Sequence, residues 1–128
     1  MNAITFSLSE NNELIRTDSL PGINSGSKDY YSVTISGLHS GTTSAVAYLT
    51  VSWISGERYS VPITISGTSG TFTVGEFFAS TPNNANEYID YHIGVSIAGY
   101  IGNVRYTTNI EYIPVIKSIY APSTTPIP

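Results

Sequence analysis

Two histidines are the residues with which a catalytic interpretation of this sequence has to begin. His39 lies within residues 37–41, whose composition is typical of a turn. His92 follows Asp90 by two residues, and alternate residues of a strand share a face. The two side chains could therefore pair as acid and base or form half of a metal site. A closed metal site needs about four ligands, so we expect a solvated polar pair instead and predict no metal.

The other reactive side chains follow no catalytic pattern. Serine and threonine are abundant, but none stands in the Gly-x-Ser-x-Gly elbow that exposes a nucleophile. The nine acidic residues are dispersed, and the glycine-flanked turn at 67–70 has no lysine after it to bind phosphate. Without cysteine there is no thiol nucleophile and no thiolate ligand. The sequence predicts a protein that is not an enzyme, with no catalytic residue, no cofactor-binding residue and no cofactor.

Tyrosine is unusually frequent: ten tyrosines accompany four phenylalanines and one tryptophan. A tyrosine combines a large apolar ring with a hydroxyl that stays hydrated, which suits a protein interface or stacking on a sugar ring. Tyrosine is also a strong β-former, so each one can equally be a half-buried strand residue. Both interpretations stay open, and the candidate surface aromatics are Tyr30, Tyr48, Tyr88 and Tyr100.

Apolar and polar residues alternate with a period of two through most of the chain, which indicates strands. In 89–97 the odd-numbered side chains should share one face, and in 104–112 the even-numbered ones should do so. Pro62 cannot donate to a strand ladder, so its strand is expected at a sheet edge or at a bulge. One helical turn is expected over 75–80. The expected strands are 4–8, 14–16, 31–35, 45–54, 59–65, 72–74, 89–97 and 104–112.

These strands and the turns between them predict an all-β fold. The type expected is an antiparallel β-sandwich of about eight strands, immunoglobulin-like or jelly-roll-like. A length of 128 residues fits one domain with one core, which we place at residues 1–120. Residues 121–128 contain three prolines and are expected to form an extended, proline-rich C-terminal arm or linker.

Charge is scarce, and this limits the kinds of partner. Charged residues make up 11% of the chain, against roughly 25% in an ordinary domain, and such a neutral surface suits a protein packed in an assembly. The net charge is −4 with scattered Lys and Arg, so we expect no nucleic-acid partner. No apolar run approaches the roughly 20 residues of a membrane span, and no signal peptide is visible. We therefore expect no membrane partner, and synthesis and folding in a cytoplasm.

One stretch of the sequence, residues 93–110, carries a resemblance to a known family. It reads IGVSIAGYIGNVRYTTNI. It resembles the last hairpin of small β-sandwich modules in virion proteins of tailed bacteriophages, such as the amino-terminal domain of upper baseplate proteins, head fibres and capsid decoration proteins. Residues 51–56 and Phe72 also match positions of such modules, and the resemblance extends over about 29–120. Its motifs are structural, so it implies no active residue. Many such proteins continue into a fibre, which leaves open whether this chain is a complete decoration protein or a shortened adaptor.

The resemblance implies a non-enzymatic virion structural protein. Such a protein, made in the host cytoplasm, would dock on other virion proteins of the capsid or tail as a decoration, fibre or adaptor protein, as a homo-oligomer. The alternative is a carbohydrate-binding module or adhesin domain that binds glycans through exposed tyrosines. The contact segments expected are 1–8 and 117–128, with these candidate assembly residues: Ile4, Phe6, Tyr120, Pro122, Pro126, Ile127 and Pro128.

Overall fold

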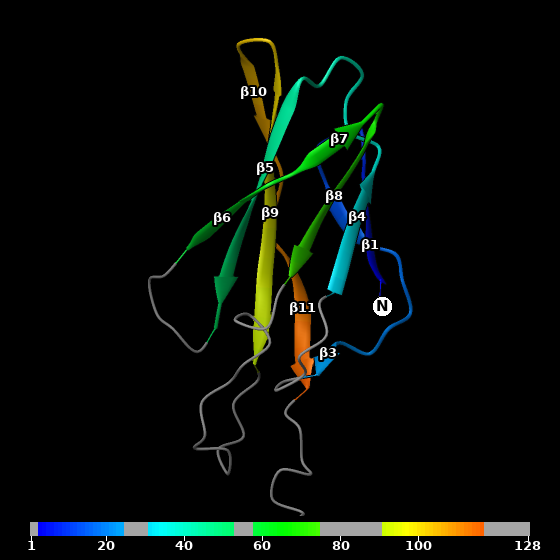
Figure 1. The fold of residues 1–128 in the computed structure, drawn as a ribbon, viewed down its shortest axis with the longest axis vertical. Coiled ribbons are helices and arrows are strands. Elements are labelled where there is room, and N and C mark those ends of the chain that lie inside the picture. The colour runs from blue at the N-terminus through cyan, green and yellow to red at the C-terminus, as the bar shows by residue number, and fades with distance from the viewer. Residues whose placement is uncertain (1–2, 25–30, 53–57, 75–90, 117–128) are drawn as a thin grey trace, which may run out of the picture.

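The computed structural model describes residues 3–24, 31–52, 58–74 and 91–116. Within these ranges every regular element is a strand, and the strands form two facing sheets (Figure 1). The predicted all-β fold with two mostly antiparallel sheets is therefore confirmed. No helix long and apolar enough to cross a membrane occurs in the described part of the chain.

The first sheet has five strands. Their spatial order is β2 (Leu14–Arg16), β1 (Ala3–Leu8), β4 (Tyr31–Ser36), β8 (Ser69–Val74) and β7 (Thr64–Ser66). The second sheet has the order β3 (Ile23–Asn24), β11 (Glu111–Ile116), β9 (His92–Ile101), β5 (Ser44–Val51) and β6 (Tyr59–Pro62), and β10 (Val104–Thr107) also pairs with β9. The pairs β1–β4 and β3–β11 are parallel, whereas the other pairs are antiparallel.

The core lies between the two sheets and follows the period of two. In β9 the side chains of Ile93, Val95 and Ile97 are buried, as the alternation predicted. They belong to one core cluster that also contains the buried side chains of β5 in the same sheet and of β1 and β4 in the other. Burial of these branched side chains, at about 1.5–3 kcal/mol each, is the main stabilising term. The buried members contributed by β1, β4 and β5 are Ile4, Phe6, Leu8, Tyr31, Val33, Ile35, Ala45, Ala47, Leu49 and Val51.

The structure has more strands than the eight expected, for three reasons. The loop expected around residue 23 contains β3, which pairs with β11. The expected strand 59–65 divides at Ile63, because the chain leaves the second sheet as β6 and enters the first as β7. The expected strand 104–112 divides into β10 and β11. Pro62 ends β6, an edge strand, as predicted. The helical turn expected over 75–80 lies outside the described residues.

The division between β10 and β11 is a β-bulge. Both strands pair with the same side of β9: Thr107 lies opposite Ala98, and Glu111 lies opposite Val95. Three residues of one strand, 108–110, therefore face two of the other, and one residue is extra. Thr108 Oγ1 accepts a hydrogen bond of 3.0 Å from the backbone N–H of Ile97, which keeps that amide paired within the bulge.

The bulge reverses the face on which the following side chains lie. Tyr106, before it, is buried, whereas Ile110 and Tyr112, after it, are exposed. The prediction that the even-numbered residues of 104–112 share one face was therefore wrong. The physical reason is that side chains alternate strictly, so one inserted residue turns every later side chain to the opposite side of the sheet.

Asn109, within the bulge, joins the two sheets. Its Oδ1 accepts a hydrogen bond of 2.6 Å from the backbone N–H of Leu14, and its Nδ2 donates one of 3.3 Å to the Leu14 carbonyl. Next to it, Glu111 Oε2 accepts a hydrogen bond of 3.4 Å from the Arg16 backbone N–H. The side chains of Asn109 and Glu111 thus bond backbone groups of β2, an edge strand that has no further strand beside it among the described residues of its own sheet. These polar contacts link the two sheets at this edge of the sandwich.

A tyrosine–glycine contact fixes the β9–β10 hairpin. The ring of Tyr106 lies so close to Gly99 that no Cβ fits there. The Tyr106 hydroxyl is 2.7 Å from Thr42 Oγ1 and accepts a hydrogen bond from the His39 backbone N–H at 3.3 Å. The His39 ring packs on Tyr106 with 4.3 Å between centroids. The absence of a side chain at Gly99 is what lets the ring lie inside the sandwich.

Asp18 is the main polar anchor beside β1 and β2. Its carboxylate accepts hydrogen bonds from the backbone N–H groups of Thr5 and Leu20 and from the Arg16 guanidinium, with distances of 2.7–2.9 Å. Burial raises the pKa of the Asp18 carboxyl, but the hydrogen bond from Arg16, the two backbone N–H groups and the charge of Arg16 together hold it below its ordinary value of 3.8.

We expect Gly99→Ala to lower the free energy of unfolding by about 2 kcal/mol, because the added methyl group collides with the Tyr106 ring. Urea denaturation measures this effect. Thr107→Ser, an exposed change in the same hairpin, is the control and should change stability by less than about 0.5 kcal/mol. In a Tyr106→Leu background the Gly99→Ala substitution should cost clearly less; an equal cost in both backgrounds would contradict the contact.

The lowered pKa of Asp18 predicts a loss of stability in acid. A carboxyl with a lower pKa in the folded state stabilises the protein at every pH above its unfolded value, near 3.8, and that contribution is lost as the pH falls through the folded pKa. Asp18→Asn should lower stability by about 2 kcal/mol at pH 7 and flatten the dependence below pH 4. Glu10→Gln, which removes an exposed carboxylate, is the control, and thermal unfolding between pH 2 and 7 measures both.

Candidate functional site

Both histidines contact neighbouring side chains in the described part of the chain. His39 Nε2 is 2.5 Å from Asn12 Oδ1, and its ring packs on Tyr106. His92 lies on the outer face of β9, with its ring edge-on to Tyr112 at 4.7 Å. Asp90, expected beside it, lies outside the described residues. No group of three or more His, Cys, Asp or Glu residues gathers in the described ranges.

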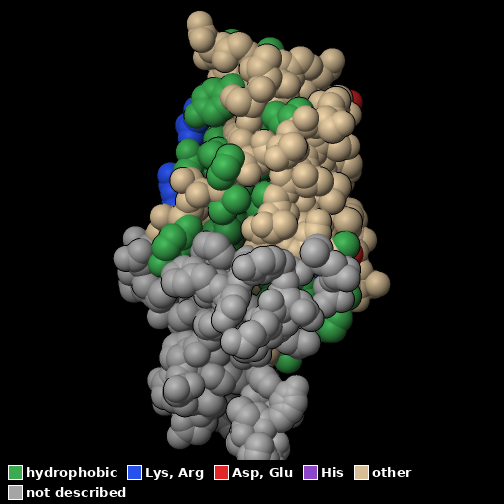
Figure 2. Space-filling view, in the orientation of Figure 1, with side chains coloured by type: hydrophobic (Ala, Val, Ile, Leu, Met, Phe, Trp, Pro, Cys, Tyr) green, Lys and Arg blue, Asp and Glu red, His purple; other side chains and the backbone are tan. Residues whose placement is uncertain are grey.

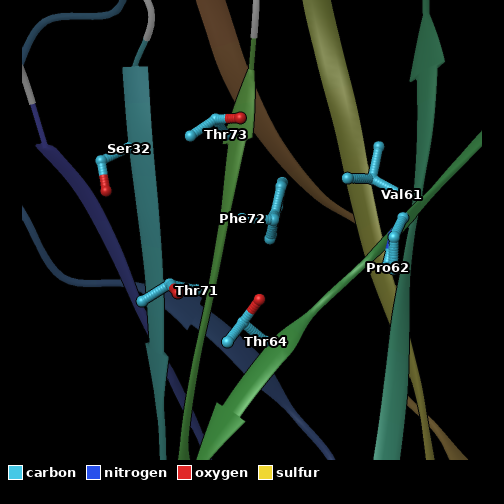
Figure 3. A pocket seen from close by; sticks show the side chains of 7 residues that line it. All are labelled: Ser32, Val61, Pro62, Thr64, Thr71, Phe72 and Thr73. Carbon is cyan, nitrogen blue, oxygen red and sulfur yellow. The ribbon is translucent and has the colours of Figure 1, made fainter.

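A pocket of about 380 Å³ lies where the chain passes from β6 to β7 (Figure 3). Val61 and Pro62 of β6 stand across it from Phe72 of β8, with threonine hydroxyls between the strands. The remaining lining residues are Ser32, Thr64, Thr71 and Thr73. Among the described lining residues there is neither a charged residue nor a histidine, so these residues supply no acid or base.

The residues predicted as assembly contacts divide into two groups. Ile4 and Phe6 are 0% and 1% exposed, and β1 lies between β2 and β4. Their side chains therefore belong to the core of this chain and do not form a contact surface. The physical reason is that alternate residues of a strand share a face, and the apolar face of β1 is the one that points into the sandwich. The others lie outside the described residues: Tyr120, Pro122, Pro126, Ile127 and Pro128.

Two of the candidate surface aromatics lie together on the outer face of the second sheet. Tyr48 of β5 and Tyr100 of β9 are both partly exposed. β5 and β9 are neighbouring strands, with Ser96 opposite Tyr48 and Ser44 opposite Tyr100. Tyr30 and Tyr88 lie outside the described residues.

Two arginines complete this group. The Arg58 guanidinium lies over the Tyr48 ring, 4.2 Å from its centroid, in a cation–π contact. Arg105 is directly opposite Tyr100 in the β9–β10 register, and side-chain hydrogen bonds with Tyr100 and then Tyr48 raise the pKa of Arg105 above its ordinary value. We call Tyr48, Arg58, Tyr100 and Arg105 the arginine–tyrosine cluster.

A second feature of the same face is a row of apolar side chains that begins at Ile110, the last residue of the bulge, and continues along β11. Ile110, Tyr112 and Ile116 are 48%, 50% and 39% exposed, and Pro114 between them is exposed as well. We call these four alternate residues the β11 stripe. Tyr112 and Ile110 fold over Gly94, where a Cβ would have no room.

Sequence reasoning named Tyr48 and Tyr100 as candidate surface aromatics but missed the two arginines and the β11 stripe, although signals for them were present. For the cluster, the two-residue turn Gly102–Asn103 places Arg105 across from Tyr100. For the β11 stripe, residues 110–116 are apolar on both alternating faces apart from Glu111, a pattern typical of a strand covered on both sides.

Comparison with known proteins adds no relative: no protein-family model matches the chain, and no curated protein matches it significantly.

The cluster should be a surface feature on which the fold does not depend. We expect Arg58→Met to lower the free energy of unfolding by no more than about 1 kcal/mol, since an exposed cation–π contact contributes little. Arg16→Met is the matched comparison. This substitution breaks the ion pair with Asp18, in which the Arg16 side chain is 14% exposed and the Asp18 side chain is 10% exposed. It should lower the free energy of unfolding by about 3 kcal/mol. Equal costs in urea denaturation would show that Arg58 is structural.

Proposed function

We propose that this chain is a non-enzymatic structural protein of a phage virion that docks on capsid or tail proteins as a decoration, fibre or adaptor protein. The β11 stripe carries the docking part of this proposal. The virion part is supported by the resemblance of residues 93–110, which form β9, β10 and the bulge that positions the stripe.

The β11 stripe has the chemistry of a protein contact. Tyr112 contributes a large ring with a hydrophilic tip, flanked on the same face by two isoleucines and a proline. None of the four side chains is charged, and a charge-depleted centre with aromatic residues is what distinguishes the core of a protein interface. Covering these side chains removes apolar surface from water, which favours association.

Within the sandwich class we propose the immunoglobulin-like type. The order β1-β4-β8-β7 in one sheet and β11-β9-β5-β6 in the other corresponds to the order A-B-E-D and G-F-C-C′ of that type. The chain crosses between sheets at the corresponding connections, from β4 to β5 and from β8 to β9. The parallel β1–β4 pair departs from it, since strands A and B normally run antiparallel.

A homo-oligomer within the virion is part of the same proposal. The long β9 strand holds β10 and β11 rigidly on one side and β5 on the other, so the stripe is presented on a fixed surface. Rigid presentation favours a repeated contact because little conformational entropy is lost on binding.

The test is binding of the purified chain to phage particles that lack this protein because its gene has been deleted from the phage genome. We expect Tyr112→Ser with Ile116→Ser to weaken binding by at least about tenfold, the effect of losing roughly 1.4 kcal/mol of interface energy. Co-sedimentation at increasing chain concentration measures the affinity, and light scattering after size-exclusion chromatography measures the oligomeric state.

Ile15→Ser is the matched control, because Ile15 is 42% exposed on β2 in the other sheet. It should leave particle binding unchanged. The docking surface proposed here would be wrong if the control weakened binding as much as the stripe substitutions. Wild-type chain that fails to bind the particles would rule out the virion role.

A further inference from the structure

Positive charge on the described residues is concentrated at one place. These ranges contain three basic residues, Arg16, Arg58 and Arg105. Arg16 forms an ion pair with Asp18. The other two arginines belong to the arginine–tyrosine cluster and contact tyrosines. Figure 2 shows Lys and Arg atoms at the left margin beside a band of hydrophobic atoms, and Asp and Glu atoms at the right margin.

Each guanidinium group lies beside a tyrosine of the cluster. Arg58 lies over the face of Tyr48, 4.2 Å from the ring centroid. Arg105 lies directly opposite Tyr100 in the β9–β10 register, and hydrogen bonding with the Tyr100 and Tyr48 side chains raises the pKa of Arg105. Each guanidinium has five N–H donors, so donors remain after these contacts. A carboxylate can accept two parallel hydrogen bonds from such a group. Two guanidinium groups, each beside a tyrosine of the cluster, therefore offer hydrogen-bond donors to an anion.

The residues opposite the tyrosines of the cluster carry hydroxyl groups. Ser60 and Ser96 lie opposite Tyr48 on its two neighbouring strands, and Ser44 lies opposite Tyr100. Thr107 follows Arg105 by two residues on the same strand and is exposed. Hydroxyl groups donate and accept, which matches the hydroxyl groups of a sugar, and tyrosine rings provide apolar surface for the sugar ring.

We propose that the arginine–tyrosine cluster binds an acidic polysaccharide, with a uronic-acid carboxylate on Arg58 and Arg105 and the sugar ring against Tyr48 and Tyr100. A nucleic acid fits less well, because its affinity rests on many neutralised phosphates and this face offers two cations on a chain of net charge −4. The inference does not rest on the virion role, since the cluster and the β11 stripe share no residue.

The test uses the full chain and defined hexasaccharides. Oligogalacturonate, hyaluronan and alginate hexamers serve as carboxylated probes, and fully methyl-esterified oligogalacturonate serves as the uncharged match. Isothermal titration calorimetry measures the affinity, and single-stranded DNA of similar charge is the third arm. We expect at least one carboxylated probe to bind, the ester to bind at least tenfold more weakly, and DNA not to bind.

Variants separate the cluster from the rest of the surface. Arg58→Met with Arg105→Met should weaken binding of the carboxylated probe at least tenfold, and Tyr100→Ala should weaken it several-fold. Tyr112→Ser with Ile116→Ser should leave it unchanged while reducing particle docking. No binding of any carboxylated probe, equal binding of the ester, equal binding of DNA, or full binding by the double arginine variant would each overturn the proposal.

Discussion

The one-residue bulge at 108–110 is the constraint on which the arrangement of the second sheet depends. Because β10 and β11 share one side of β9, the extra residue decides which side chains enter the core. Tyr106 before the bulge enters it and packs on Gly99, whereas Tyr112 after it faces outward. The same residue shift places Asn109 where its amide pairs with the backbone of Leu14 in the other sheet. One irregularity therefore sets the core contact, the link between sheets and the exposed stripe.

The outer face of the second sheet presents two surfaces of different chemistry. The β11 stripe is apolar and uncharged, while the arginine–tyrosine cluster combines two guanidinium groups with two rings. Three residues of β9 with small side chains, Gly94, Ser96 and Ala98, lie on that face between the stripe and the cluster. The β11 stripe is suited to binding by burial of apolar area, and the arginine–tyrosine cluster to binding by charge-assisted hydrogen bonds. A sheet held rigid from behind by a continuous core can present both without a change of shape.

The polar residues of the described ranges mostly serve the fold. His39 bridges Asn12 and Tyr106, Asp18 binds two backbone amides and Arg16, and Thr108 completes the hydrogen bonding of the bulge. Each meets a need created by the sandwich itself, since backbone groups at sheet edges and bulges must find partners once water is removed. The arginines of the cluster instead contact tyrosine side chains, and for this reason we propose them as residues for binding.

Local pattern alone determined the class of fold and most of the core. The alternation in residues 93–97 directed Ile93, Val95 and Ile97 inward, and Pro62 indicated an edge strand, because both follow from the geometry of a single strand. The same alternation includes Ile4 and Phe6, but only the packing of β1 between β2 and β4 showed that these two side chains lie in the core of this chain. The cluster draws Tyr48, Arg58, Tyr100 and Arg105 from separate strands, and the stripe depends on an inserted residue that reverses the alternation. Strand order and register are long-range properties, so the tertiary structure alone decided where the cluster and the stripe lie.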